Sequence, residues 1–230
     1  MTFRSRLVLT PLALAAACAA PNPALDLATN DRIYIDVPFR SRIPGDRDLF
    51  VAPLEDGRSA AELPAEEGGF PISYGSDQVW ERPVREMVDE ILARQLADSA
   101  LFRGVAERVG DDTVVLAPTL VSFTTGALEC VAGARAFAEV GLRLRVFGPV
   151  EASGKRPLLL DETVSERQIT PPSLRPVSPY LLAGSALRAT MQKSLATLDT
   201  SNVGRSFVPE VAAAAPVIPE LAPPAAPADK

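Results

Sequence analysis

Residues 138–146 read AEVGLRLRV, and this stretch decides the expected fold. Its apolar residues alternate with charged or small ones, so that every second side chain lies on the same side of an extended chain. The apolar positions are Ala138, Val140, Leu142, Leu144 and Val146. The spacing predicts a β-strand with one face on a hydrophobic core and the other face, with Glu139, Arg143 and Arg145, toward water.

This strand is followed by a turn-rich segment and by a second alternating segment. Residues 148–155 read GPVEASGK, which combines Gly, Pro and Ser as turns do. Residues 158–164 then resume the alternation through Leu158, Leu160 and Val164. Two alternating segments joined by a turn predict an antiparallel hairpin.

Three further strands are expected on the N-terminal side of this hairpin. Residues 32–37 alternate and are β-branched, and residues 48–53 form a short apolar run that ends at a proline. Residues 112–123, DTVVLAPTLVSF, are apolar on both faces, which is typical of a covered strand. Because Pro118 has no N–H to donate, we expect it at a sheet edge or at a bulge.

Two helices are expected from apolar residues that recur every three or four positions. The first begins between Asp77, a good N-cap, and Pro83, which is tolerated in a first turn. Its apolar face consists of Val84, Met87, Val88, Ile91 and Leu92. The second begins at Ser178 and Pro179 and ends at the polar run 199–202. Its apolar stripe consists of Tyr180, Gly184, Leu187, Met191, Leu195 and Leu198.

The order of these elements predicts an α+β fold, with a largely antiparallel sheet and two helices packed on one face of it. The single domain is expected to span residues 31–205. Before it, residues 18–30 are rich in Ala, Pro and Asn and predict a tether. After it, residues 206–230 are rich in Pro and Ala and predict a disordered tail.

The N-terminus has the three parts of a secretory signal peptide. Arg4 and Arg6 precede an apolar stretch, residues 7–14, and three alanines follow at residues 15–17. The apolar stretch is shorter than the roughly 20 residues that a transmembrane helix needs. We therefore expect residues 1–17 to be removed on export.

The residue after these alanines is Cys18, and the junction resembles the lipobox of bacterial lipoproteins. The resemblance implies cleavage before Cys18 and acylation of its sulfur, which would hold the domain on a membrane. It departs from the usual pattern because Ala15 stands where leucine is usual. By the same resemblance, Ala19 in place of Asp after the cysteine implies the outer membrane, with the domain facing the periplasm. The alternative is ordinary secretion with cleavage after Ala19 or Ala20.

Composition excludes several kinds of chemistry. The chain has no histidine and two cysteines, so His-dependent triads, Cys-His nucleophiles and imidazole metal sites are excluded. With Cys18 acylated, Cys130 alone cannot supply a zinc site. The glycines show no phosphate-loop spacing. We therefore expect neither an enzyme nor a metal or cofactor. A formal net charge of −6 also argues against a nucleic-acid partner.

Four residues are candidates for a ligand or partner surface. Trp80, with Tyr74 before it, would line a groove where the first helix begins, whereas the simpler interpretation has Trp80 packing under the helix start. Arg143 and Arg145 would bind an anion on the wet face of their strand. The simpler interpretation makes these two arginines exposed charges on a half-solvated sheet.

A family resemblance rests on residues 51–58, VAPLEDGR, on residues 79–102, VWERPVREMVDEILARQLADSALF, and on the strands and helix after them. This layout resembles the auxiliary lipoproteins of ABC-type envelope transport systems and, in its order of elements, lipopolysaccharide-assembly lipoproteins. The resemblance implies a non-catalytic subunit that docks on a membrane-embedded partner and helps to move lipid-like substrates. Two other functions stay open, which are a freestanding lipid- or glycan-binding module and a structural envelope protein.

Overall fold

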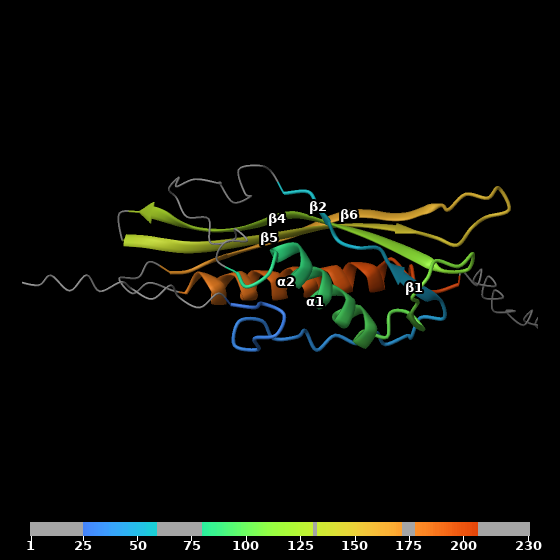
Figure 1. Cartoon of the computed structure of the whole chain (residues 1–230), viewed down its shortest axis with the longest axis horizontal. Coiled ribbons are helices and arrows are strands. Elements are labelled where there is room, and N and C mark those ends of the chain that lie inside the picture. The colour runs from blue at the N-terminus through green and yellow to red at the C-terminus, as the bar shows by residue number, and fades with distance from the viewer. Residues whose placement is uncertain (1–24, 59–79, 131–132, 172–177, 207–230) are drawn as a thin grey trace, which may run out of the picture.

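A computed structural model describes residues 25–58, 80–130, 133–171 and 178–206, with side chains described outside 127–134. Within these ranges, eight elements follow one another along the chain (Figure 1). They are β1 (Asp48–Val51), β2 (Glu55–Asp56), α1 (Val84–Asp98), β3 (Gly104–Val105), β4 (Val114–Cys130), β5 (Gly133–Phe147), β6 (Leu158–Ile169) and α2 (Pro179–Thr200). None of the helices in the described ranges is long and apolar enough to cross a membrane.

The described strands form one mixed sheet in the order β3-β1-β4-β5-β6, with β2 also paired to β4. The three long strands β4, β5 and β6 are antiparallel neighbours, as the hairpin prediction requires. The short strands β1 and β2 run parallel to β4, and β3 runs parallel to β1. Parallel neighbours need a crossover connection, and α1 lies between β2 and β4 in the chain. The α+β prediction is confirmed, and the sheet is largely antiparallel with short parallel pairs that the sequence pattern did not predict.

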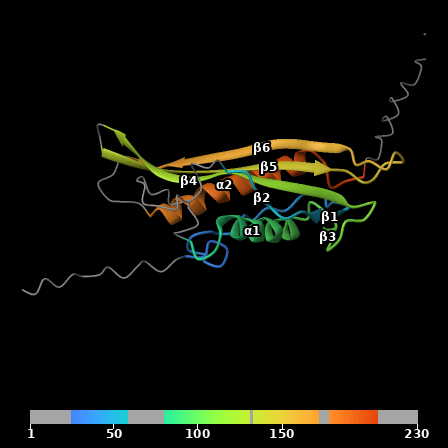
Figure 2. The ribbon, with the colours of Figure 1, turned by 45° about the horizontal axis from the view of Figure 1, so that its top comes forward.

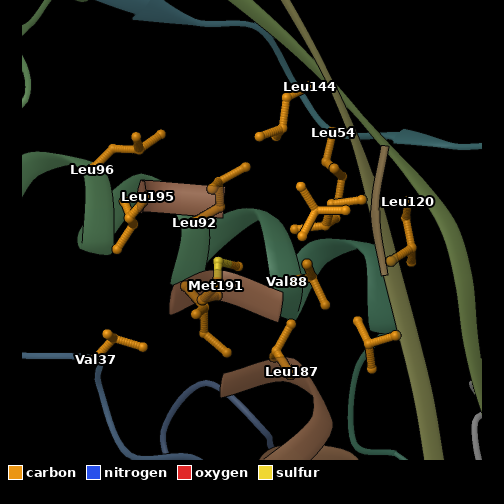
Figure 3. Close-up of a cluster of buried hydrophobic side chains, with 14 of the residues drawn as sticks. Val37, Leu54, Val88, Leu92, Leu96, Leu120, Leu144, Leu187, Met191 and Leu195 are labelled. Atoms are coloured by element: carbon orange, nitrogen blue, oxygen red, sulfur yellow. The ribbon is translucent and has the colours of Figure 1, made fainter. Parts of the chain in front are cut away.

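Both helices lie on the same side of the sheet, which two views of the ribbon show (Figures 1 and 2). The core fills the space between helices and sheet, where Leu187 and Met191 of α2 lie near Val88 of α1 and Leu120 of β4 (Figure 3). The predicted stripe of α2 is buried from Gly184 to Leu198, and Pro179 begins the helix as expected. Helix α1 begins at Val84, directly after Pro83.

Residues 32–37 do not form the strand that their alternation predicts. The N–H groups of Ile33 and Tyr34 both donate to the Asn30 carbonyl, at 2.9 and 3.1 Å, as in a turn. The Val37 N–H donates to the Gln95 side chain on α1 at 2.8 Å. Ile33, Tyr34 and Val37 are buried while Ile35 is 58% exposed. The buried residues of this segment therefore pack on the helices. The alternation in the sequence reflects this packing and not pairing with a neighbouring strand.

Strand β4 is longer than the predicted segment 112–123, since its pairing with β5 continues to Cys130. Pro118 lies between the residues of β4 that pair with β1, which end at Leu116, and those that pair with β2, which begin at Thr119. A register shift follows at Leu120. The missing N–H of proline thus falls in a gap between two short neighbours and close to a bulge.

The folded domain begins before Asp31. Leu27 is fully buried, and its N–H approaches the Met87 sulfur at 3.2 Å. Leu25 pairs with Trp80, and Asp26 accepts a hydrogen bond from Arg82 at 2.8 Å. Residues 25–30 are therefore domain and not tether. The predicted signal peptide, residues 18–24 and the tail after residue 206 lie outside the described residues.

Gly184 marks the closest approach between the N-terminal segment and α2. A Cβ atom at this position would lie 1.8 Å from the carbonyl oxygen of Ile33. Gly184→Ala should therefore displace residues 25–37 and lower the free energy of unfolding by about 1–3 kcal/mol, although alanine favours the helix itself. Chemical denaturation measures this cost, and the exposed neighbour supplies the control, because Ser185→Ala should change the stability by less than about 0.5 kcal/mol. A Gly184→Ala variant as stable as the control would contradict the close contact.

Candidate functional site

The outer face of the sheet, away from the helices, carries Arg143 and Arg145, and both are paired with carboxylates. The Arg143 guanidinium donates two hydrogen bonds of 2.7 Å to Asp161 on β6. These bonds hold the pKa of the Asp161 carboxyl below its usual value. Arg145 lies 3.4 Å from Glu55 on β2. The two arginines therefore form cross-strand ion pairs on a solvated face, which is the simpler of the two interpretations of their sequence.

Trp80 lies in the core and is 4% exposed. Its indole meets the ring of Phe123 edge-on, with centroids 6.0 Å apart, and the ring of Tyr180 in the same way at 5.0 Å. Trp80 thus joins the start of α1 to β4, to the start of α2 and, through Leu25, to the N-terminal segment. The structure places it as a packing residue and not as the wall of an open groove. Tyr74 and Cys18 lie outside the described residues.

A cavity of about 420 Å³ lies at the end of the domain where α2 ends, and we call it the end pocket. Its lining comes from three segments that are distant in sequence, which are the residue directly before β1, the connection from β5 to β6, and the residues after α2. Figure 1 shows that these parts of the chain lie at the same end of the domain. Its lining consists of Arg47, Pro149, Val150, Glu151, Pro157, Leu159, Ser201, Asn202, Val203 and Arg205. Cavities of a few hundred cubic ångströms with apolar walls are common as binding sites.

The two guanidinium groups of the end pocket differ in their partners. Arg205 is held in place by Asp199 at 2.7 Å, by the Ile43 carbonyl at 2.8 Å and by Ser41 at 3.0 Å. The Arg47 Nε is buried and meets no acceptor among the described residues. This nitrogen is enclosed by protein atoms, so Arg47 lines the cavity through its other atoms. Because two arginines and several apolar residues line it, the end pocket suits a group that combines an apolar part with a carboxylate or phosphate.

Sequence reasoning did not find the end pocket, because its residues come from segments with no common pattern. The nearest signal is the polar run 199–202, which by itself predicts only the end of a helix. Asn202 has a φ of 53°, in the left-handed region, and this turns the chain toward the end pocket. In the described part of the chain, no group of three or more carboxylates or thiols could hold a metal ion.

Comparison with known proteins gives distant structural similarity only. No family model matches the chain, and no curated protein matches it. Among solved structures, it is similar to a Xanthomonas campestris protein described under the family model DUF330, at 16% identity and a TM-score of 0.48, covering 73% of this chain and 91% of that one. It is also similar to a minor lipoprotein from Acinetobacter baumannii, at 11% identity and a TM-score of 0.40, covering 70% of this chain and 96% of that one. Lipoprotein GNA1162 from Neisseria meningitidis is similar at 14% identity and a TM-score of 0.26, covering 66% of this chain and 99% of that one.

Proposed function

We propose that this chain is a lipid-anchored, non-catalytic protein of the bacterial outer membrane that faces the periplasm. In this proposal it acts as an accessory or assembly subunit of an envelope transport system for lipid-like substrates. It docks on a membrane-embedded protein partner. The observation that supports this function best is the position of the end pocket relative to the point where the chain enters the domain.

The chain enters the described domain at Leu25, near Trp80 and the first residues of α2 (Figure 2). The end pocket lies past the other end of α2, a helix of 22 residues that spans about 33 Å. The chain between Cys18 and Leu25 can extend no further than about 25 Å. An acyl group on Cys18 would therefore hold the Leu25 end of the domain close to the membrane and leave the end pocket directed away from the anchor.

The chemistry of the end pocket supports a protein partner. Half of its lining residues are proline, valine or leucine, and Arg47 and Arg205 add two positive charges. An extramembrane loop that carries an apolar residue beside an aspartate or glutamate would place the apolar residue against this wall and the carboxylate near the two arginines. A charge-assisted hydrogen bond of this kind gives both orientation and energy to an interface.

The anchor is tested by replacing Cys18. In cells grown with an alkyne analogue of palmitate, the wild-type chain should become labelled and Cys18→Ala should lose the label, because the thiol is the acyl acceptor at the junction. Cys130→Ala supplies the matched control and should keep the label. A labelled Cys18→Ala variant would show that the chain is not a lipoprotein of this kind.

Docking is tested by photo-cross-linking in intact cells. A benzophenone residue in place of Glu151, at the rim of the end pocket, should give an adduct with an integral membrane protein of a transport system. The same residue in place of the exposed Thr29, at the Leu25 end, should give little of it. Arg47→Ala should lower the yield from position 151. Adducts with lipid or glycan alone would favour the freestanding binding module, and equal yields from both positions would contradict docking through the end pocket.

A further inference from the structure

Strand β6 lies at an edge of the sheet, and its partner in the described part of the chain is β5. It has 12 residues, and most of them are exposed. An edge of this length leaves a row of backbone N–H and carbonyl groups free to pair with another strand. Its ends are apolar, since Leu158, Leu159 and Ile169 are 53%, 43% and 42% exposed.

The two faces of β6 follow from its pairing with β5. Val164 pairs with Leu142 and is buried against the helices. Since neighbouring side chains of a strand alternate between faces, the odd-numbered residues from Asp161 to Ile169 lie on the outer face. In this stretch the outer residues are Asp161, Thr163, Ser165, Arg167 and Ile169.

We propose that β6 pairs antiparallel with β6 of a second copy of this chain, around a two-fold axis at Val164. This register sets Asp161 opposite Arg167 of the other copy, and the two-fold axis repeats this ion pair. Ile169 comes to lie against the exposed bulge at Leu158 and Leu159 of the other copy. The helices of both copies then lie on the same side of one continuous sheet.

The charges on the outer face already alternate toward this edge within one copy. Arg143 binds Asp161, and Arg167 binds Glu139 at 2.7 Å. Pairing of two β6 strands would join the first pair of one copy to the second pair of the other. The resulting row reads Arg143 and Asp161 of one copy, followed by Arg167 and Glu139 of the second copy. Neighbouring charges in this row are opposite in sign throughout, which favours the pairing.

Other registers lose this match. A shift by two residues sets Arg167 opposite Thr163 in one direction and opposite Leu159 in the other, so that the ion pair disappears. On the inner face, the proposed register places Glu162 opposite Glu166 of the other copy. The Glu166 charge is already bound by Lys193 at 2.9 Å, which offsets the repulsion. A single strand pair buries little surface, and we expect an affinity in the micromolar range.

Disulfide trapping tests the register in cells. Cys130→Ser removes the remaining thiol, and two tagged forms of this variant are co-expressed, one with Thr163→Cys and one with Ser165→Cys. The proposal places position 163 of one copy opposite position 165 of the other, with their Cβ atoms about 5 Å apart. The two copies of position 163 are then about 7–8 Å apart, as are the two copies of position 165. The mixed disulfide should exceed either self-linked dimer at least fivefold. Thr119→Cys, at a position of β4 that is paired with β2 on one side and β5 on the other, should give none, and equal yields from all forms would overturn the register.

Charge reversal tests the attraction independently. Arg167→Asp and Asp161→Arg should each lower the dimerisation constant of the detergent-solubilised chain at least tenfold, because like charges then face each other in both halves of the interface. A mixture of the two variants restores two opposite pairs across the interface and should associate more tightly than either variant alone. Sedimentation equilibrium measures this, and far-UV circular dichroism confirms that each variant is folded. A mixture that stays monomeric, or a wild type that stays monomeric at 1 mM and cannot be trapped, would overturn the proposal.

Discussion

Replacing Trp80 with alanine is expected to lower the free energy of unfolding by about 3–5 kcal/mol. The indole is almost fully buried and meets the rings of Phe123 and Tyr180 edge-on, so the substitution leaves a cavity where four parts of the chain meet. Urea denaturation of the purified protein measures the loss, and Trp80→Phe should recover part of it by keeping an aromatic ring.

The control for Trp80 is an exposed apolar residue. Ile35 is 58% exposed, and Ile35→Ala should cost less than about 0.5 kcal/mol. If Trp80→Ala were nearly as stable as this control, Trp80 would not be the packing residue that the structure describes. The interpretation of Trp80 as part of a ligand groove would then regain support.

Leu187→Ala in α2 should cost about 2–5 kcal/mol. Leu187 is fully buried among Val88, Met191 and other core side chains (Figure 3), so the removed atoms leave a void that the packed core fills only in part. Such a loss is a large share of the stability of an average domain. The measurement is again chemical denaturation, with the slope of the transition compared between variants.

The neighbouring residue tests the orientation of the helix. Arg188 is exposed, and Arg188→Ala should cost well under 1 kcal/mol. Equal costs at Leu187 and Arg188 would mean that α2 is turned the other way or is covered on all sides. Leu195 lies on the same buried stripe as Leu187 and should behave like it.

Periodic patterns predicted the parts of the fold that bury a whole face. The alternation of residues 138–146 predicted the strand β5 and which of its residues face the core. The apolar stripe of residues 180–198 predicted the buried face of α2. The same reasoning failed for residues 32–37, where the buried side chains pack on helices without a neighbouring strand. It also missed the parallel pairing of β1 and β2 with β4. Residues 48–53 were expected as a strand, but a pattern within one strand does not identify its neighbour or its direction, and β2 has too few residues to show a pattern.

The candidate site could be predicted less well than the fold. The sequence identified Arg143 and Arg145 as exposed charges, but their partners Asp161 and Glu55 lie on other strands and follow only from the register. The end pocket depends on the meeting of Arg47, the β5–β6 connection and the residues after α2. A cavity built from segments so distant along the chain has no local signature. The pairing of opposite charges along β6 likewise becomes visible only when its edge position is known.

The contact between Ile33 and Gly184 has a consequence for the order of folding. It joins the first described segment of the domain to its last helix. Contacts between residues so distant in sequence form late and slowly, because the intervening loop must first be closed. Residues 25–37 therefore complete their packing only after α2 has taken its place on the sheet. A chain that ended before α2 would leave the buried side chains of this segment exposed to water.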